Sequence, residues 1–276
     1  MKGERCMLAA HCDGNKAKTA RRIIEVLEYF DEQHREATVM DIVRRYNRPQ
    51  SSTSELLATL VELGMLYKDN RSRLYTLTPR AAILGSIAQP AFVRHGTLSV
   101  VVDSLIAQHG LSMALFGLVG LNTQIFRWSL GSRQEPRDAG QLCNGAQERL
   151  CDSTVGLLLL STIEQNRRAG MLRRLNAEAP EEKKFVPSQM NQQVQEAAMR
   201  GFVTGPVAFD SSAHVAAILL PSDDSSRPIA LGFVYEPSED IDPSMLIASL
   251  RSAMSRNAET PLRDASEPCE PLLHAA

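Results

Sequence analysis

Apolar residues recur three and four positions apart in three short stretches near the N-terminus, residues 17–30, 39–46 and 49–63. This spacing places them on one face of an α-helix and predicts three amphipathic helices. Only Asn47 and Arg48 connect the second helix to the third. A turn this short between two helices predicts a helix-turn-helix.

The second and third helices carry recognisable start and stop residues. Thr38 precedes the second helix, and Asp41 follows three residues later in a near capping box. Pro49 opens the third helix, where its missing N–H costs no hydrogen bond, and Gly64 suits the C-terminal end. The buried stripe of the third helix is expected to consist of Leu56, Leu57, Leu60 and Leu63.

The segment LYKDNRSRLYTLT, residues 66–78, predicts a β-hairpin. Its ends alternate and favour strands, while DNRSR between them is turn-forming and basic. Three helices followed by a basic hairpin make a winged helix-turn-helix. Residues 80–95 look helical, are interrupted by Pro90, and are expected to link this unit to a second domain.

The second half alternates helical and strand-like stretches, with a polar, irregular segment at 131–149. Hairpin-length connections between neighbouring strands favour an antiparallel sheet with flanking helices, an α+β fold. The predicted helices are 93–108, 151–162, 164–177, 188–200 and 242–256, and the predicted strands are 112–119, 123–130, 203–209, 214–220 and 229–235.

These patterns predict five segments. They are an unstructured N-terminus (1–15), a winged helix-turn-helix (16–79), a linker helix (80–95), a second domain (96–256) and a disordered tail (257–276) rich in Pro, Glu and Ala.

Composition narrows the class of protein without naming it. The 276 residues are 43% hydrophobic and 22% charged, with a net charge of −2, as in a soluble globular protein. Between Lys16 and Arg73 eleven basic residues face nine acidic ones, a small positive balance that permits nucleic-acid binding. The five cysteines and six histidines lack metal-ligand spacing, so no metal or cofactor is expected. With no signal peptide or membrane span in the sequence, the expected location is the cytoplasm, without a membrane partner.

The third helix begins with the polar residues 50–54, which form its N-terminal tip, and continues with a leucine-rich stretch at 56–63. In a helix-turn-helix this end enters the major groove of DNA. Short hydroxyls and an amide allow close approach and reach phosphates and base edges, and the free N–H groups of the helix favour a phosphate. Arginines on the second helix, the turn and the wing are placed to grip the DNA backbone. The candidate DNA-binding residues are Arg44, Arg45, Arg48, Gln50, Ser51, Ser52, Thr53, Ser54, Arg71 and Arg73.

Each of these features has a plainer explanation. Serines at a helix start often serve only as caps, and an Arg-Arg pair is usually a solvated face. Two other classes of function also stay open, a winged helix that binds protein and an enzyme with a helical scaffold. The enzyme class is disfavoured, because the sequence contains no GxSxG, P-loop, HExxH or strand-linked GxGxxG motif.

The stretch TVMDIVRRYNRPQSSTSELLATLVELGMLYKD, followed by RLYTLT, resembles the N-terminal domain of the IclR family of bacterial transcription regulators. In the second half, CDSTVGLLLLS (151–161) and TGPVAFDSSAHVAAILLP (204–221) resemble two further motifs of that family. The resemblance implies a winged helix-turn-helix, a linker helix and a GAF/profilin-like ligand-sensing domain. It also implies a two-fold DNA operator, a small-molecule effector such as an organic or aromatic acid, and action as a homodimer or homotetramer.

A dimer is expected on physical grounds too, because a single module with so small a positive balance binds DNA weakly at physiological salt. The first helix and the linker helix are the expected contact. Three departures from the family pattern are Glu55 in place of Arg, Cys151 in place of His and Leu157 in place of Lys. They leave the operator sequence and the effector class open.

The effector is expected on the sheet face beneath the 151–162 helix. A helix cap at Ser153 and ordinary core packing are the alternative explanations for these side chains. The candidate effector-binding residues are Leu115, Phe126, Cys151, Ser153, Thr204 and Phe209.

Overall fold

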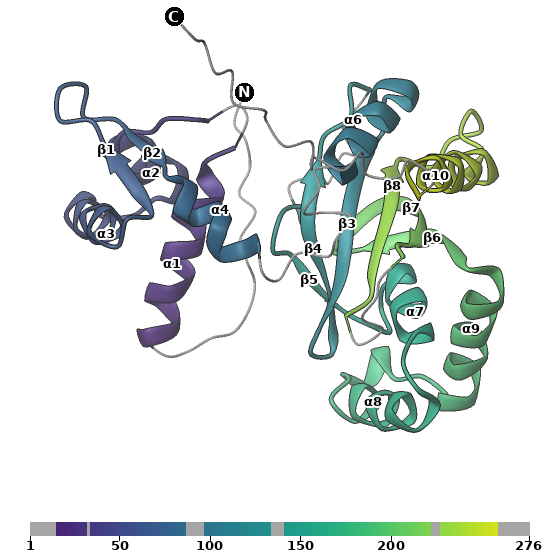
Figure 1. Ribbon diagram of the computed structural model, residues 1–276. Coiled ribbons are helices and arrows are strands. Elements are labelled where there is room, and N and C mark those ends of the chain that lie inside the picture. The colour runs from purple at the N-terminus through teal and green to yellow at the C-terminus, as the bar shows by residue number, and fades with distance from the viewer. Residues whose placement is uncertain (1–14, 32–33, 87–96, 134–140, 222–226, 259–276) are drawn as a thin grey trace, which may run out of the picture.

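The computed structural model describes residues 15–31, 34–86, 97–133, 141–221 and 227–258 (Figure 1). Three predicted segments lie outside these ranges. They are the N-terminus before residue 15, the linker beyond residue 86 with Pro90, and the tail beyond residue 258. The first group of elements is α1 (Asn15–Tyr29), α2 (Val39–Tyr46), α3 (Gln50–Glu62), β1 (Leu66–Lys68), β2 (Tyr75–Leu77) and α4 (Pro79–Ser86).

Helices α1, α2 and α3 enclose one small core, and the three predicted helices are confirmed. Leu57 and Leu60 are the buried residues of the predicted leucine stripe, and Leu56 packs partly against them. Leu63 is instead more than half exposed, because the helix ends there at its C-cap. The third buried residue of the helix is instead Thr53, one turn before Leu57.

The local signals also formed as predicted. Thr38 caps α2 in a full capping box with Asp41, and Asn47 ends that helix in the left-handed conformation. Gly64 follows α3 with a φ of +69°. Pro49 lies one position earlier than expected, at the N-cap of α3. Strands β1 and β2 pair antiparallel, so the predicted wing hairpin is confirmed.

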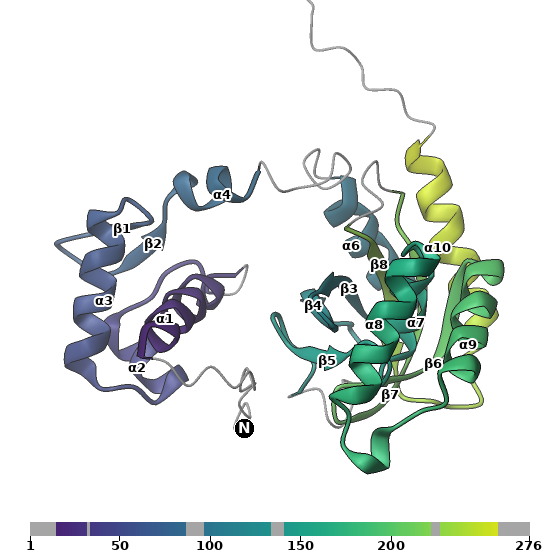
Figure 2. The same ribbon diagram turned by 90° about the horizontal axis from the view of Figure 1, so that it is seen from below.

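The remaining elements form a six-stranded antiparallel sheet with helices on both faces (Figure 2). The strand order is β5-β4-β3-β8-β7-β6. The strands are β3 (Ser112–Val119), β4 (Asn122–Ser129), β5 (Gln147–Arg149), β6 (Phe202–Ala208), β7 (Ser211–Leu219) and β8 (Ile229–Tyr235). The helices are α6 (Thr97–His109), α7 (Thr154–Ser161), α8 (Gln165–Ala177), the short 3-10 helix η2 (Glu181–Lys183), α9 (Pro187–Arg200) and α10 (Pro243–Ala258).

Each face of the sheet has its own core. Helices α7, α8 and α9 cover the face that carries Phe116 and Ile125, and this face is called the α7 face below. Helices α6 and α10 cover the opposite face, which carries Met113 and Phe233. Side chains of a strand alternate between the two faces, so the near-continuous apolar run of β8 is buried on both sides.

The predicted α+β class is confirmed, with two local corrections. The segment 131–149 was expected to be irregular, but Gln147–Arg149 form the edge strand β5. The 3-10 helix η2 was not expected either. Helix α10 runs to Ala258, slightly past the predicted start of the tail. Among the described helices, none combines the length and apolarity that a membrane span needs.

Candidate nucleic-acid interface and effector face

The exposed side of α3 is a polar stripe that begins at its N-terminal tip. Gln50, Ser51, Ser54 and Glu55 are exposed, while Leu57 on the opposite side is fully buried. The exposed positions lie three and four apart, so they share one face of the helix. The side of the helix with the hydroxyl groups is therefore accessible to a partner.

The first turn of α3 lacks the cap that α2 has. Pro49 occupies the N-cap position and provides no side-chain acceptor. The first helical hydrogen bond of the turn runs from the Thr53 N–H to the Pro49 carbonyl. The N–H groups of the three preceding residues point out of the helix end, where the positive end of the helix dipole favours an anion.

Two of the predicted contact residues at this tip are turned into the helix. Thr53 is only 4% exposed, and its hydroxyl donates to the Pro49 carbonyl at 2.9 Å. The expectation that Thr53 contacts DNA is therefore wrong, because the side chain packs in the core. The hydroxyl of Ser52 donates to the same carbonyl at 3.2 Å, and Ser52 is half-buried.

Arg48 is also engaged inside the domain. Its Nη2 lies 3.1 Å from both carboxylate oxygens of Glu25 on α1. Next to it, the Tyr46 hydroxyl donates to the Glu25 backbone carbonyl at 2.6 Å. Burial raises the pKa of Tyr46 from 10.0 to about 12, so the hydroxyl keeps the proton that it donates even in moderately alkaline solution.

The other predicted arginines on α2 are exposed. Arg44 and Arg45 occupy the last turn of α2, where a cation also complements the helix dipole. In the described part of the chain, neither forms an ion pair with Glu55. The carboxylate of Glu55 therefore stands on the exposed face of α3 without a cation from α2.

The wing turn is organised by Asp69. Its Oδ1 accepts from the Arg71 N–H at 2.9 Å, and its Oδ2 accepts from the Ser72 hydroxyl at 2.6 Å. Arg73 takes a φ of +60° and donates its N–H to the Asp69 carbonyl. The Ser72 hydroxyl and the Arg71 N–H hold the pKa of Asp69 below its usual value. The turn thus presents the exposed side chains of Arg71 and Arg73 from an ordered backbone.

The six predicted effector residues do not converge on one face. Leu115 packs with the α6 and α10 core, so it lies on the face opposite α7. Phe126 lies there too, because its ring covers Gly117, the residue after the α7-face Phe116. Thr204 alternates with the α7-face Val203 and is exposed. The expectation that these three line a pocket beneath α7 is wrong, because residue alternation along β3, β4 and β6 turns them the other way.

The other three effector candidates do lie on the α7 face. Cys151 and Phe209 pack in its core. Ser153 is buried, and its hydroxyl accepts from the Gly156 N–H as the N-cap of α7. Burial raises the pKa of the Cys151 thiol to about 12, so it stays neutral and is a poor nucleophile or metal ligand.

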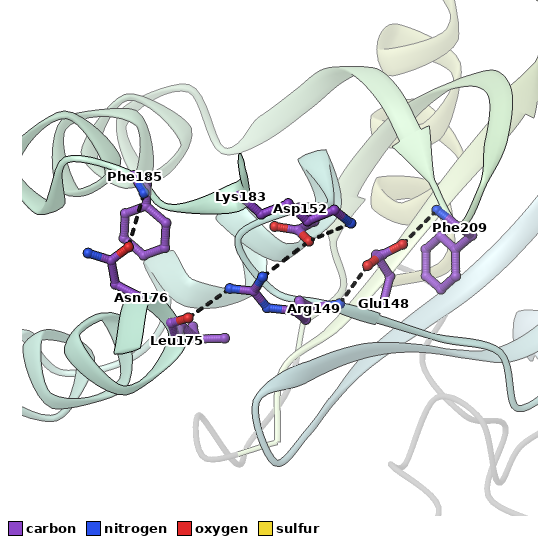
Figure 3. Close-up of polar contacts among 8 residues, drawn as sticks. All are labelled: Glu148, Arg149, Asp152, Leu175, Asn176, Lys183, Phe185 and Phe209. Atoms are coloured by element: carbon purple, nitrogen blue, oxygen red, sulfur yellow. Dashed lines mark hydrogen bonds and ion pairs between the residues drawn. The ribbon is translucent and has the colours of Figure 1, made fainter. Parts of the chain in front are cut away.

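A charged network that sequence reasoning missed surrounds the start of α7 (Figure 3). Arg149 on β5 donates from Nη2 to the Leu175 carbonyl of α8 at 2.7 Å, and its Nη1 lies 3.6 Å from the Asp152 carboxylate. Lys183 of η2 reaches the same carboxylate at 3.2 Å. The hydrogen bond and the charge of Asp152 raise the pKa of Lys183. Three elements, β5, α8 and η2, are therefore tied to the turn that precedes α7.

Glu148 extends this network to the β6–β7 turn, as Figure 3 shows. Its Oε2 accepts from the Phe209 N–H at 3.2 Å. Ala208, Phe209 and Asp210 all have positive φ values, so the turn is held in a conformation that non-glycine residues rarely adopt. The signal in the sequence was the run of charged residues just before the buried α7 helix, inside a segment expected to be irregular.

Comparison with known proteins agrees with this arrangement. The family model of the IclR helix-turn-helix domain matches residues 19–70. No curated protein matches the chain. The fold is shared with an IclR homologue of Microbacterium hydrocarbonoxydans, solved in complex with 4-hydroxybenzoate, at 18% identity and a TM-score of 0.56, covering 86% of this chain and 96% of that one.

Two further solved structures share the fold. The Thermotoga maritima IclR has 12% identity and a TM-score of 0.53, covering 88% of this chain and 96% of its own. An IclR regulator of Alicyclobacillus acidocaldarius has 16% identity and a TM-score of 0.53, covering 90% and 97%. The family model thus identifies residues 19–70 as an IclR helix-turn-helix domain, and the chain shares its fold with these solved IclR proteins.

Proposed function

We propose that this regulator binds duplex DNA through the N-terminal end of α3, with the wing on the neighbouring backbone. The observation that carries the proposal is the exposed, uncapped first turn of α3. A phosphate oxygen is the natural acceptor for its N–H groups, and the side chains of Gln50, Ser51 and Ser54 reach base edges. The exposed Arg44, Arg45, Arg71 and Arg73 supply phosphate contacts.

The proposed operator is two-fold, and the proposed assembly is a homodimer or homotetramer. Exposed apolar side chains on α1 and α4 support a contact between copies there. Ile24 of α1 is about half exposed, and Ile83 and Leu84 of α4 are 65% and 59% exposed. Large apolar side chains on two helices of one small domain are typical of a surface that is covered in the assembly.

The second domain is proposed to bind a small-molecule effector on the α7 face, near Cys151, Ser153 and Phe209. The IclR homologue solved with 4-hydroxybenzoate supports an organic or aromatic acid as the class of ligand. A ligand that binds only the folded state, present at a concentration of a hundred times its Kd, stabilises that state by about 2.7 kcal/mol. A thermal-shift screen of such acids in which none raises the Tm would contradict a sensing role.

DNA binding is tested with fragments selected by the full-length protein from its source genome. Ser54→Ala removes an exposed hydroxyl from the tip, and Thr59→Ala removes an exposed hydroxyl farther along the same helix. A single hydrogen bond from a hydroxyl contributes about 0.5–1.5 kcal/mol, so Ser54→Ala should weaken binding by roughly 2- to 12-fold. Thr59→Ala should leave it unchanged.

Raising the salt concentration should weaken binding with a measurable slope, because phosphate contacts release counterions. Selection that retains no duplex at low salt would overturn the proposal. It would instead favour a winged helix that binds another protein.

A further inference from the structure

An ion pair beneath the proposed DNA-binding tip ties α1 to the turn before α3. The Glu25 carboxylate is only 13% exposed, and the Arg48 side chain is 36% exposed. Arg48 Nη2 lies 3.1 Å from each carboxylate oxygen. The Nε of Arg48 is buried as well, with no hydrogen-bond partner among the described residues. Two of the three guanidinium nitrogens are thus turned into the domain.

The same turn of α1 holds the other side of the connection. The Tyr46 hydroxyl donates to the backbone carbonyl of Glu25 at 2.6 Å. Tyr46 and Arg48 flank Asn47, whose left-handed conformation forms the sharp part of the turn. Glu25 therefore fixes this turn at two points, through its carboxylate and through its carbonyl.

From Arg48 the constraint continues directly into α3. Pro49 comes next, and its carbonyl accepts from the Thr53 N–H and from the hydroxyls of Ser52 and Thr53. A small hollow lies where the three helices meet, below the tip. Glu25, Tyr46, Arg48, Ser52 and Thr53 all line it. A shift of Arg48 would therefore move the first turn of α3.

We propose that Glu25 is a positioning residue for DNA binding, and that Arg48 serves as its partner rather than as a phosphate contact. The carboxylate holds Arg48 in the domain and thereby sets where the tip of α3 lies relative to α1. This inference rests on the proposed DNA-binding function. Breaking a pair of largely buried charges by removing one partner leaves the other uncompensated, so the turn would relax away from its present geometry.

For removal of the Glu25 carboxylate, the inference and simple electrostatics predict opposite changes in the affinity for DNA. Removing a carboxylate near DNA should tighten binding, because it removes repulsion of the phosphates. Removing a positioning carboxylate should weaken binding instead. Glu28→Gln is the matched control, since Glu28 lies one turn along α1 and is exposed. Loss of an arginine that contacts phosphate should also reduce the salt slope by about one.

The experiment measures the affinity of the full-length protein for a labelled duplex that it selected from its source genome. The salt concentration is varied between 50 and 200 mM, an interval over which several phosphate contacts lower the affinity by about tenfold or more. Glu25→Gln and Arg48→Gln are each expected to weaken binding by about 5- to 30-fold, the range that 1–2 kcal/mol represents. The double variant should bind the duplex with about the same affinity as the single variant that binds less tightly. Its salt slope should be unchanged. Glu28→Gln should bind as well as the wild type or better.

The swapped variant Glu25→Arg/Arg48→Glu keeps the test decisive if a single variant fails to fold, as judged by circular dichroism. It restores the pair and should recover part of the binding, which a phosphate-contacting Arg48 would not allow. Tighter binding by Glu25→Gln, additive losses in the double variant, or a salt slope lowered by one in Arg48→Gln would each overturn the inference. Absence of binding by the wild type would overturn the proposed function itself.

Discussion

At the scale of single residues, Gly156 determines how closely α7 approaches the chain that precedes it. A Cβ at this position would lie 2.0 Å from the backbone carbonyl oxygen of Leu150. Backbone atoms cannot give way as the end of a flexible side chain can. The glycine of the 151–161 motif therefore has a steric reason, because α7 starts immediately against buried Leu150.

Gly156→Ala is expected to destabilise the second domain by about 1–3 kcal/mol, because the added methyl group forces α7 away from Leu150. Gly170 in α8 is the matched control, since nothing lies within 4 Å of a Cβ there. Gly170→Ala should stabilise by about 0.5–1 kcal/mol, the usual gain from replacing glycine in a helix. Urea unfolding of both variants measures the difference. Equal effects of the two substitutions would contradict the steric explanation.

At the scale of elements, α2 is defined by its capping box. The Asp41 carboxylate accepts from the Thr38 N–H at 2.8 Å and from the Thr38 hydroxyl at 2.7 Å, and that hydroxyl in turn accepts from the Asp41 N–H. The hydrogen bonds from the side chain and the backbone of Thr38 lower the pKa of Asp41 below its ordinary value of 3.8. The stability of the start of α2 should therefore depend on pH.

Thr38→Ala should destabilise the helix-turn-helix by about 1 kcal/mol at neutral pH. Because the folded-state pKa of Asp41 lies below the unfolded one, its contribution is complete above the unfolded pKa and is lost as pH falls through the folded pKa. The difference in the free energy of unfolding between the wild type and Asp41→Asn should accordingly become smaller below about pH 4. Unfolding monitored at several pH values tests this. A gap independent of pH would show that the carboxylate does not support the cap.

Elements with strong local signals were predictable from the sequence, and long-range arrangements were not. The capping box of α2, the stop at Gly64 and the wing turn depend on residues within a few positions of each other. The strand β5 is only three residues long and exists because it pairs with β4, a contact that no local pattern reveals.

The candidate sites follow the same division. The exposed tip of α3 was predicted, because helical spacing alone separates Ser51 and Ser54 from Leu57. The faces of Leu115, Phe126 and Thr204 were not, because they depend on strand register and on a bulge between Leu115 and Phe116. The commitment of Arg48 to Glu25, 23 residues away in the chain, likewise depends on tertiary structure.

At the scale of the whole molecule, the apolar side chains left exposed on α4 bear on assembly. Ile83→Glu places a charge in the proposed contact between copies and should convert a dimer into monomers. The loss should reduce operator affinity by at least tenfold, because linking two heads raises the effective concentration of the second. Sedimentation at micromolar concentration, without and with operator, measures both effects.

Met199→Glu is the control for this substitution, since Met199 of α9 is 80% exposed and lies outside the proposed contact. It should leave both the mass and the affinity unchanged. A wild-type protein that sediments as a monomer, and remains unpaired on its operator, would contradict the two-fold assembly.

The missing side-chain cap on α3 has a dynamic consequence. With Pro49 at the N-cap, the first amides of this helix have no side-chain cap among the described residues. The end of the helix should therefore fray in the unbound protein, and its amide protons should exchange rapidly with deuterium. A docked phosphate would take the place of the absent cap, so that exchange at residues 50–52 slows when DNA binds while exchange at the capped start of α2 barely changes.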